Sequence, residues 1–114
     1  MPSLPKPPDT FVEFIGRFPE LGRAWETARQ AERAGPLDDR TRRLVKLAVA
    51  VGGRAEGAVH SAARKALAAG ATADEIYQVV ALASSTIGFP NAVAAFSWVR
   101  DVLNGAAGPA SPGG

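Results

Sequence analysis

Apolar residues recur three and four positions apart along most of the chain, which is the spacing of a helix that buries one face. The clearest run has its apolar positions at Ile76, Val79, Val80, Ala83 and Ile87. It follows Thr72-Ala73-Asp74-Glu75, in which the Thr72 hydroxyl and the Glu75 carboxylate can satisfy reciprocal backbone amides as a capping box. The pattern predicts a helix that begins directly after Thr72.

Glycine and proline divide the rest of the chain into segments of helical length. They stand at Gly35-Pro36, Gly52-Gly53, Gly70, Gly88-Phe89-Pro90 and Gly105. We expect further helices at 10–18, 19–34, 56–69, from Asp38 or Asp39 to Gly52-Gly53, and from near Pro90 to Gly105. Strand alternation and hairpin turns are absent from the sequence, so the predicted fold is all-α, a compact bundle of about six helices.

The predicted helix at 56–69 is unusually rich in alanine, which lets neighbouring helices approach closely. We expect it to lie centrally or at a subunit interface. The predicted domain spans 10–104, with a proline-rich tail at 1–9 and a tail of Gly, Ala, Pro and Ser at 105–114. Both tails are expected to be flexible because neither buries enough apolar surface to order itself.

A chain of 114 residues with 46% hydrophobic and 21% charged residues has the composition of one globular domain. Its core is thin at this size, so we expect an obligate oligomer. The longest apolar stretches fall far short of the roughly 20 residues that a membrane span requires. The N-terminus also lacks the apolar region of a signal peptide, and we expect a cytoplasmic protein without a membrane partner.

The net charge is only +2, but the charges are segregated along the chain. Residues 40–65 carry seven Arg or Lys and one acid, Glu56, whereas residues 9–39 carry seven acids and four arginines. Two interpretations stay open: the two stretches face each other within or between subunits, or the basic stretch forms a pocket for a small anionic ligand. Nucleic acid is not an expected partner, because 40–65 has no aromatic residue to stack on bases.

The run from Leu37 to Ala50, then Ala63 to Ile76 and Gly88-Phe89-Pro90, closely resembles the carboxymuconolactone decarboxylase family, which includes the alkyl hydroperoxidase D-like proteins. The resemblance covers about 35–103. It implies a compact all-helical fold that usually assembles as a homotrimer or as a homohexamer built from dimers. No cofactor is implied.

The chain departs from the peroxidase-like branch at every working position. The two cysteines of that branch fall on Ala55 and Ala58, its histidine on Ala62 and its upstream glutamate on Arg43. A disulfide-forming pair needs two thiols, and the chain contains no cysteine, so a Cys-x-x-Cys peroxidase is excluded. A metal site is not expected either, because one histidine and no cysteine leave too few nitrogen or sulfur ligands.

The decarboxylase branch resembles Gly53-Arg54-Ala55-Glu56-Gly57-Ala58-Val59-His60, including its Glu-to-His spacing. The histidine of that branch precedes the helix-ending glycine by two residues fewer than His60 does. Two residues turn a helix by about 200°, so this register directs His60 away from the family's usual site.

Glu56 and His60 are spaced i, i+4 and are the candidate acid–base pair, with Arg43, Lys46 and Arg54 as candidates to hold a substrate carboxylate. The predicted activity is cysteine-independent decarboxylation or isomerisation of a small carboxylate or lactone. Three alternatives stay open. Glu56 and His60 can form a weak surface pair, Arg43 can form an inter-subunit ion pair, or the chain can be a catalytically inactive binding or assembly module.

Overall fold

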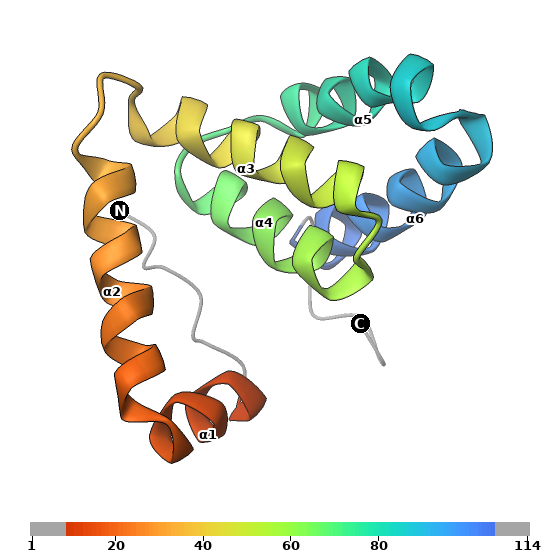
Figure 1. Ribbon diagram of the computed structural model, residues 1–114. Coiled ribbons are helices and arrows are strands. Elements are labelled where there is room, and N and C mark those ends of the chain that lie inside the picture. The colour runs from red at the N-terminus through yellow and green to blue at the C-terminus, as the bar shows by residue number, and fades with distance from the viewer. Residues whose placement is uncertain (1–8, 107–114) are drawn as a thin grey trace.

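The computed structural model describes residues 9–106, and they form six helices (Figure 1). The helices are α1 (Asp9–Arg17), α2 (Pro19–Arg33), α3 (Asp39–Gly53), α4 (Glu56–Ala68), α5 (Ala73–Ile87) and α6 (Phe89–Ala106). The described part of the chain contains no strand. This confirms the predicted all-α fold of about six helices. Most of the predicted tails at 1–9 and 105–114 lies outside the described residues. Helix α1 begins one residue before the predicted domain of 10–104, and α6 ends two residues after it.

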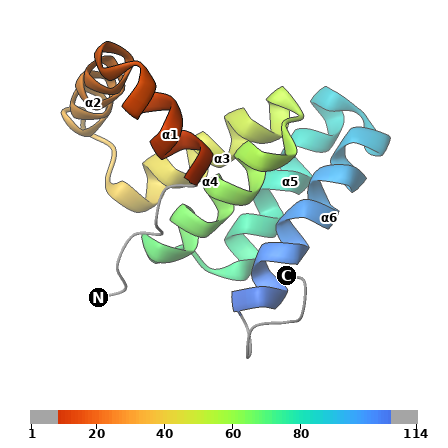
Figure 2. The same cartoon turned by 90° about the horizontal axis from the view of Figure 1, so that it is seen from below.

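Helices α3 to α6 form a bundle around one apolar core. α3 packs against α4 and α5, and α6 packs against the same two helices (Figures 1 and 2). The largest fully buried side chains come from all four helices of this bundle and are Leu47, Val51, Val59, Ile76 and Val99. Each contributes about 1.5–3 kcal/mol by leaving water, so this bundle is the stable unit that positions the rest.

Local signals fix where the bundle helices begin and end. The Asp38 carboxylate accepts a hydrogen bond from the Thr41 backbone amide at 2.8 Å and caps α3. At the start of α5, the capping box of Thr72 and Glu75 is present in both directions. Gly70 ends α4 with a φ of 97°, a left-handed conformation that costs other residues about 1–2 kcal/mol. The starts of α3 and α5 are therefore fixed by the capping hydrogen bonds that the sequence predicts.

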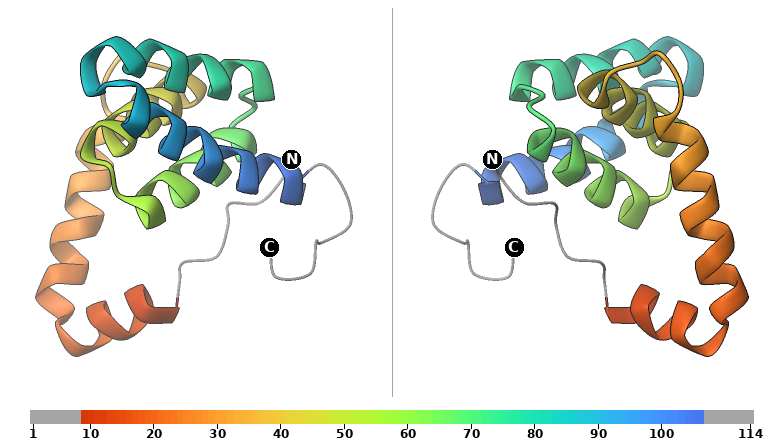
Figure 3. Two further views of the ribbon diagram at one scale, coloured as in Figure 1. Left: turned by 90° about the vertical axis from the view of Figure 1, so that its right-hand side faces the viewer. Right: turned by 90° about the vertical axis from the view of Figure 1, so that its left-hand side faces the viewer.

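Helices α1 and α2 form an arm that projects from the bundle (Figures 1 and 3). They pack on each other, with Gly22 allowing close approach: a Cβ at that position would lie 3.3 Å from Cβ of Ile15. The rings of Phe11 and Trp25 also pack against each other in a tilted arrangement, with centroids 5.3 Å apart and an interplanar angle of 59°. Neither helix has a fully buried residue, so the arm is held far less firmly than the bundle.

No helix within 9–106 has both the length and the apolar character needed to cross a bilayer.

Candidate functional site

Three helices present one face each to the space between the arm and the bundle. On α2 this face carries Trp25, Arg29 and Glu32, spaced i, i+4 and i+7. The corresponding residues are Arg43, Lys46 and Ala50 on α3, and Ala58, Ala62 and Lys65 on α4. Residues at such spacing lie on one side of a helix, so all nine converge on the same region.

An apolar cavity of about 340 Å³ occupies this region. Its lining consists of Trp25, Arg43, Lys46, Val49, Ala50, Ala58, Ser61, Ala62 and Lys65. Small-molecule sites commonly enclose about 300–1,000 Å³ and combine apolar walls with a few polar groups. Five of these nine residues are apolar, three are cations and one is a hydroxyl, so the cavity has the composition of a site for a small amphipathic anion.

A smaller cationic pocket adjoins this cavity and shares Trp25, Arg43, Lys46 and Lys65 with it. Its lining consists of Trp25, Arg29, Glu32, Arg33, Arg42, Arg43, Lys46 and Lys65. Six of these eight residues are cations and only one is an acid. The pocket therefore carries an excess of positive charge at the border of an apolar space, where electrostatic attraction is stronger than in water.

Arg43 is a mostly buried cation of this pocket. Its side chain is only 17% exposed, and its Nε is buried without a hydrogen-bond partner among the described residues. The Asp39 carboxylate lies 3.6 Å from that nitrogen, close enough for ion pairing but too far for a hydrogen bond. A buried donor without a hydrogen-bond partner is unfavourable, so the Arg43 guanidinium is incompletely satisfied within the described residues.

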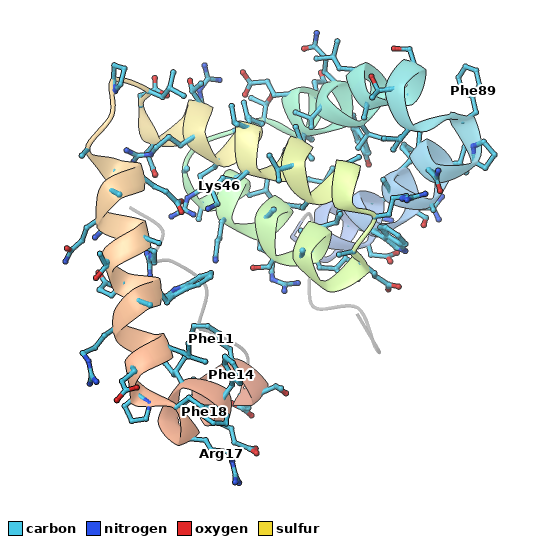
Figure 4. The ribbon with its side chains drawn as sticks, in the orientation of Figure 1. Phe11, Phe14, Arg17, Phe18, Lys46 and Phe89 are labelled. Atoms are coloured by element: carbon cyan, nitrogen blue, oxygen red, sulfur yellow. The ribbon has the colours of Figure 1, made fainter. Side chains whose placement is uncertain are left out.

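Lys46 crosses from α3 to the arm. Its Nζ donates to Glu32 on α2 at 2.5 Å, and this bond lowers the pKa of the Glu32 carboxyl. Figure 4 places Lys46 between α2 and the α3–α4 pair, whereas Phe89 lies at the far end of the bundle. The acidic and basic stretches thus meet here within one chain, but Glu32 is the only acid of the first stretch that lines the cationic pocket.

Lys65 lies half-buried on α4 and borders both spaces. Desolvation lowers the pKa of its amine first, and the positive charges of Arg43, Arg29 and Lys46 lower it further, while Glu32 opposes them. The described residues offer Lys65 no ion pair. Its charged form is therefore disfavoured by its surroundings.

The structure separates the five site residues predicted from the sequence. Arg43 and Lys46 line the apolar cavity, while Glu56, His60 and Arg54 line neither space. His60 Nε2 lies 3.7 Å from the Asp101 carboxylate on α6 and has no hydrogen-bond partner in the part of the chain described. Glu56 and Arg54 are exposed around the α3–α4 connection, where Arg54 caps α3 with a left-handed φ of 55°.

Sequence reasoning missed Trp25, Arg29 and Lys65 as parts of the site. The signal for Lys65 was its position seven residues after Ala58 and three after Ala62, two positions where the resemblance places redox residues. The peroxidase-like branch has its working residues at Ala55, Ala58, Ala62 and Arg43. All of these except Ala55 line the apolar cavity. Within 9–106, no cluster of three or more His, Asp or Glu side chains is placed to hold a metal ion.

The comparison with known families agrees with this architecture. The model of the carboxymuconolactone decarboxylase family matches residues 19–101, which covers α2 to most of α6 and all three helices that line the cavity. No curated protein and no solved structure gives a significant match. Because the family model matches well over half of the sequence, the chain belongs to the carboxymuconolactone decarboxylase family.

Proposed function

We propose that the chain binds a small carboxylic acid with an apolar body in the apolar cavity between α2, α3 and α4. The observation that carries the proposal is the mostly buried side chain of Arg43, which lines an apolar space of about 340 Å³ and whose Nε has no hydrogen-bond partner among residues 9–106. A carboxylate would accept from Arg43 and pair with Lys46, while its apolar body would lie against Val49, Ala50 and Ala58. The family description names a carboxylated lactone, which belongs to this chemical class.

Cysteine-independent decarboxylation or isomerisation of such an acid would have to use groups that reach the cavity. Arg43 and Lys46 would hold the carboxylate, as expected from the sequence. Glu56 and His60 do not line the cavity, so acid–base work by that pair receives no support from the geometry. Any proton transfer would instead involve Lys65 or Ser61, the other polar groups on its wall.

The proposal is tested by calorimetric titration with 4-methylpentanoate, a branched acid, and with its neutral amide. We expect the acid to bind more weakly as salt increases and the amide not to bind. Ala58→Leu fills part of the cavity from an exposed position and should weaken binding at least about tenfold, because the bulk replaces the space for the ligand. Ala81→Leu is the matched control, since Ala81 is an exposed helical alanine outside the cavity. Equal binding of acid and amide would reject the proposal.

A second candidate function is self-assembly, and the arm favours it. Phe14 on α1, Leu21 and Trp25 on α2, and Phe18 between these two helices each keep between 46% and 49% of their surface exposed, although the two helices pack on each other. Exposed apolar clusters of this kind mark protein–protein contacts. A homotrimer or homohexamer would cover this surface, and light scattering should then give a multiple of the 11.8 kDa chain mass. Strict monomers at all concentrations would reject this candidate.

A further inference from the structure

Lys65 combines three properties that rarely occur together in a surface lysine. It borders the apolar cavity, it lies beside three other cations, and it has no ion-pair partner among residues 9–106. Lys46, in contrast, is paired with Glu32 and has 47% of its side chain exposed. Burial and like charges around Lys65 both favour loss of its proton, so the neutral amine is more accessible than in an exposed lysine.

A neutral amine in an apolar site is a nucleophile toward carbonyl carbon. The neighbouring cations have a second effect, because they can hold the carboxylate of a substrate that carries the carbonyl. Arg43 and Lys46 on α3 border the same cavity as Lys65 on α4. A bound acid whose carbonyl is next to its carboxylate would therefore have that carbonyl beside the amine.

We infer that Lys65 is a nucleophilic residue that forms an imine with a 2-oxo acid whose carboxylate is held by Arg43 and Lys46. This inference rests on the proposed carboxylate site and adds a substrate class and a covalent step to it. It requires neither a thiol nor a metal ion. It also gives Lys65 a role of its own, because Arg43 and Lys46 already suffice to hold the carboxylate.

Imine formation between Lys65 and the oxo acid releases one molecule of water. The Lys65 nitrogen lone pair forms a bond to C2 of the oxo acid, and the carbonyl π electrons move to oxygen, which takes up a proton to give a carbinolamine. The nitrogen loses a proton, the oxygen leaves as water, and a carbon–nitrogen double bond forms. Ser61, one turn before Lys65 on the cavity wall, supplies a hydroxyl that can donate to the departing oxygen. The protonated imine then draws electrons from C3 and allows a C3 proton to leave to water.

The test is reductive trapping with 4-methyl-2-oxopentanoate and cyanoborohydride at neutral pH, followed by peptide mapping. Cyanoborohydride reduces an imine to a stable secondary amine, so each trapped site gains the mass of the oxo acid less one oxygen atom. The chain contains three lysines, Lys6, Lys46 and Lys65, which compete in the same sample. We expect trapping at Lys65 to be at least about tenfold faster than at the other two, because its amine borders the cavity without an ion-pair partner in 9–106, whereas the Lys46 amine is paired with Glu32.

Arg64 offers a matched control, since it is the next residue on α4 but is exposed and lines neither space. The double exchange Arg64→Lys with Lys65→Arg keeps composition and charge while it moves the amine by one position. It should lose the fast trapping and keep the helical circular dichroism of the wild type. Equal trapping at all lysines, or undiminished trapping in the exchanged chain, would overturn the inference.

Competition by a ligand without a carbonyl tests the same inference on the wild-type chain. Saturating 4-methylpentanoate has the same carboxylate and carbon chain but no carbonyl, so it should slow trapping at Lys65 about tenfold by occupying the cavity. If this acid binds but Lys65 is not trapped preferentially, the imine is rejected and the carboxylate site stands. If the acid does not bind at all, the proposed function itself fails.

Discussion

Arg43→Met removes the guanidinium from the cavity while it keeps the length of an unbranched stem. In most helices, removal of a half-buried arginine lowers stability because the side chain loses hydrogen bonds and packing. Arg43 differs because its Nε has no hydrogen-bond partner among the described residues and its charge lies beside Lys46 and Lys65. Its ion pair with the half-exposed Asp39, at 3.6 Å, contributes little by comparison. We therefore expect the free energy of unfolding to stay the same or rise when methionine replaces it.

The effect on ligand binding should be opposite and large. A hydrogen bond between a charged donor and a carboxylate contributes about 1.5–3 kcal/mol, which corresponds to roughly 10- to 150-fold in affinity. Calorimetric titration of Arg43→Met with 4-methylpentanoate should show a loss in this range. The pKa of Lys65 should also move up toward its usual range, because one of the cations that lowers it is gone, and NMR titration of labelled lysine would follow it.

Arg40→Met is the matched control on the same helix. Arg40 lies one turn before Arg43, is paired with Glu75 and lines neither the apolar cavity nor the cationic pocket. It should lower the unfolding midpoint slightly and leave the affinity unchanged. Wild-type affinity for the acid in Arg43→Met, or an equal loss of affinity in Arg40→Met, would refute the role of Arg43 in binding.

Three further predictions concern the fold. Gly70→Ala should lower the free energy of unfolding by about 1–2 kcal/mol in denaturant titration because of the left-handed φ, whereas Gly53→Ala, with helical geometry and open space, should not. Hydrogen bonds from the Thr72 backbone amide and then from Arg40 lower the pKa of Glu75. The stability that this carboxylate contributes is therefore present above about pH 5 and is lost on acidification below about pH 4. In an acid titration followed by circular dichroism, Glu75→Gln should reduce this loss. Gly22→Leu should separate α1 from α2, with a cost of about 1–3 kcal/mol, and speed amide hydrogen exchange in α1.

The bundle could be predicted from the sequence because its signals are local. The capping box at Thr72, the cap at Asp38 and the glycine at 70 each act within one turn of helix, and the structure shows each contact or conformation. The family resemblance rested on the same segments, and the family model confirms it. Helix boundaries therefore agree with the prediction to within a few residues.

The cavity could not be predicted in this way because it depends on where α2 lies relative to α3 and α4. No fully buried side chain anchors α2, so its apolar pattern contains little information about its partner. The local spacing of Glu56 and His60 indicated a pair, but the structure places Asp101 of α6 beside His60 instead. Such a contact joins residues far apart in the chain, and helical spacing alone does not reveal it.

The most direct test of the carboxylate site is an NMR titration of the wild-type chain with 4-methylpentanoate. Saturable shift changes should centre on the Trp25 indole and on the methyl groups of Val49, Ala58 and Ala62, which line the apolar cavity. Changes centred on His60, or none that saturate, would contradict the account.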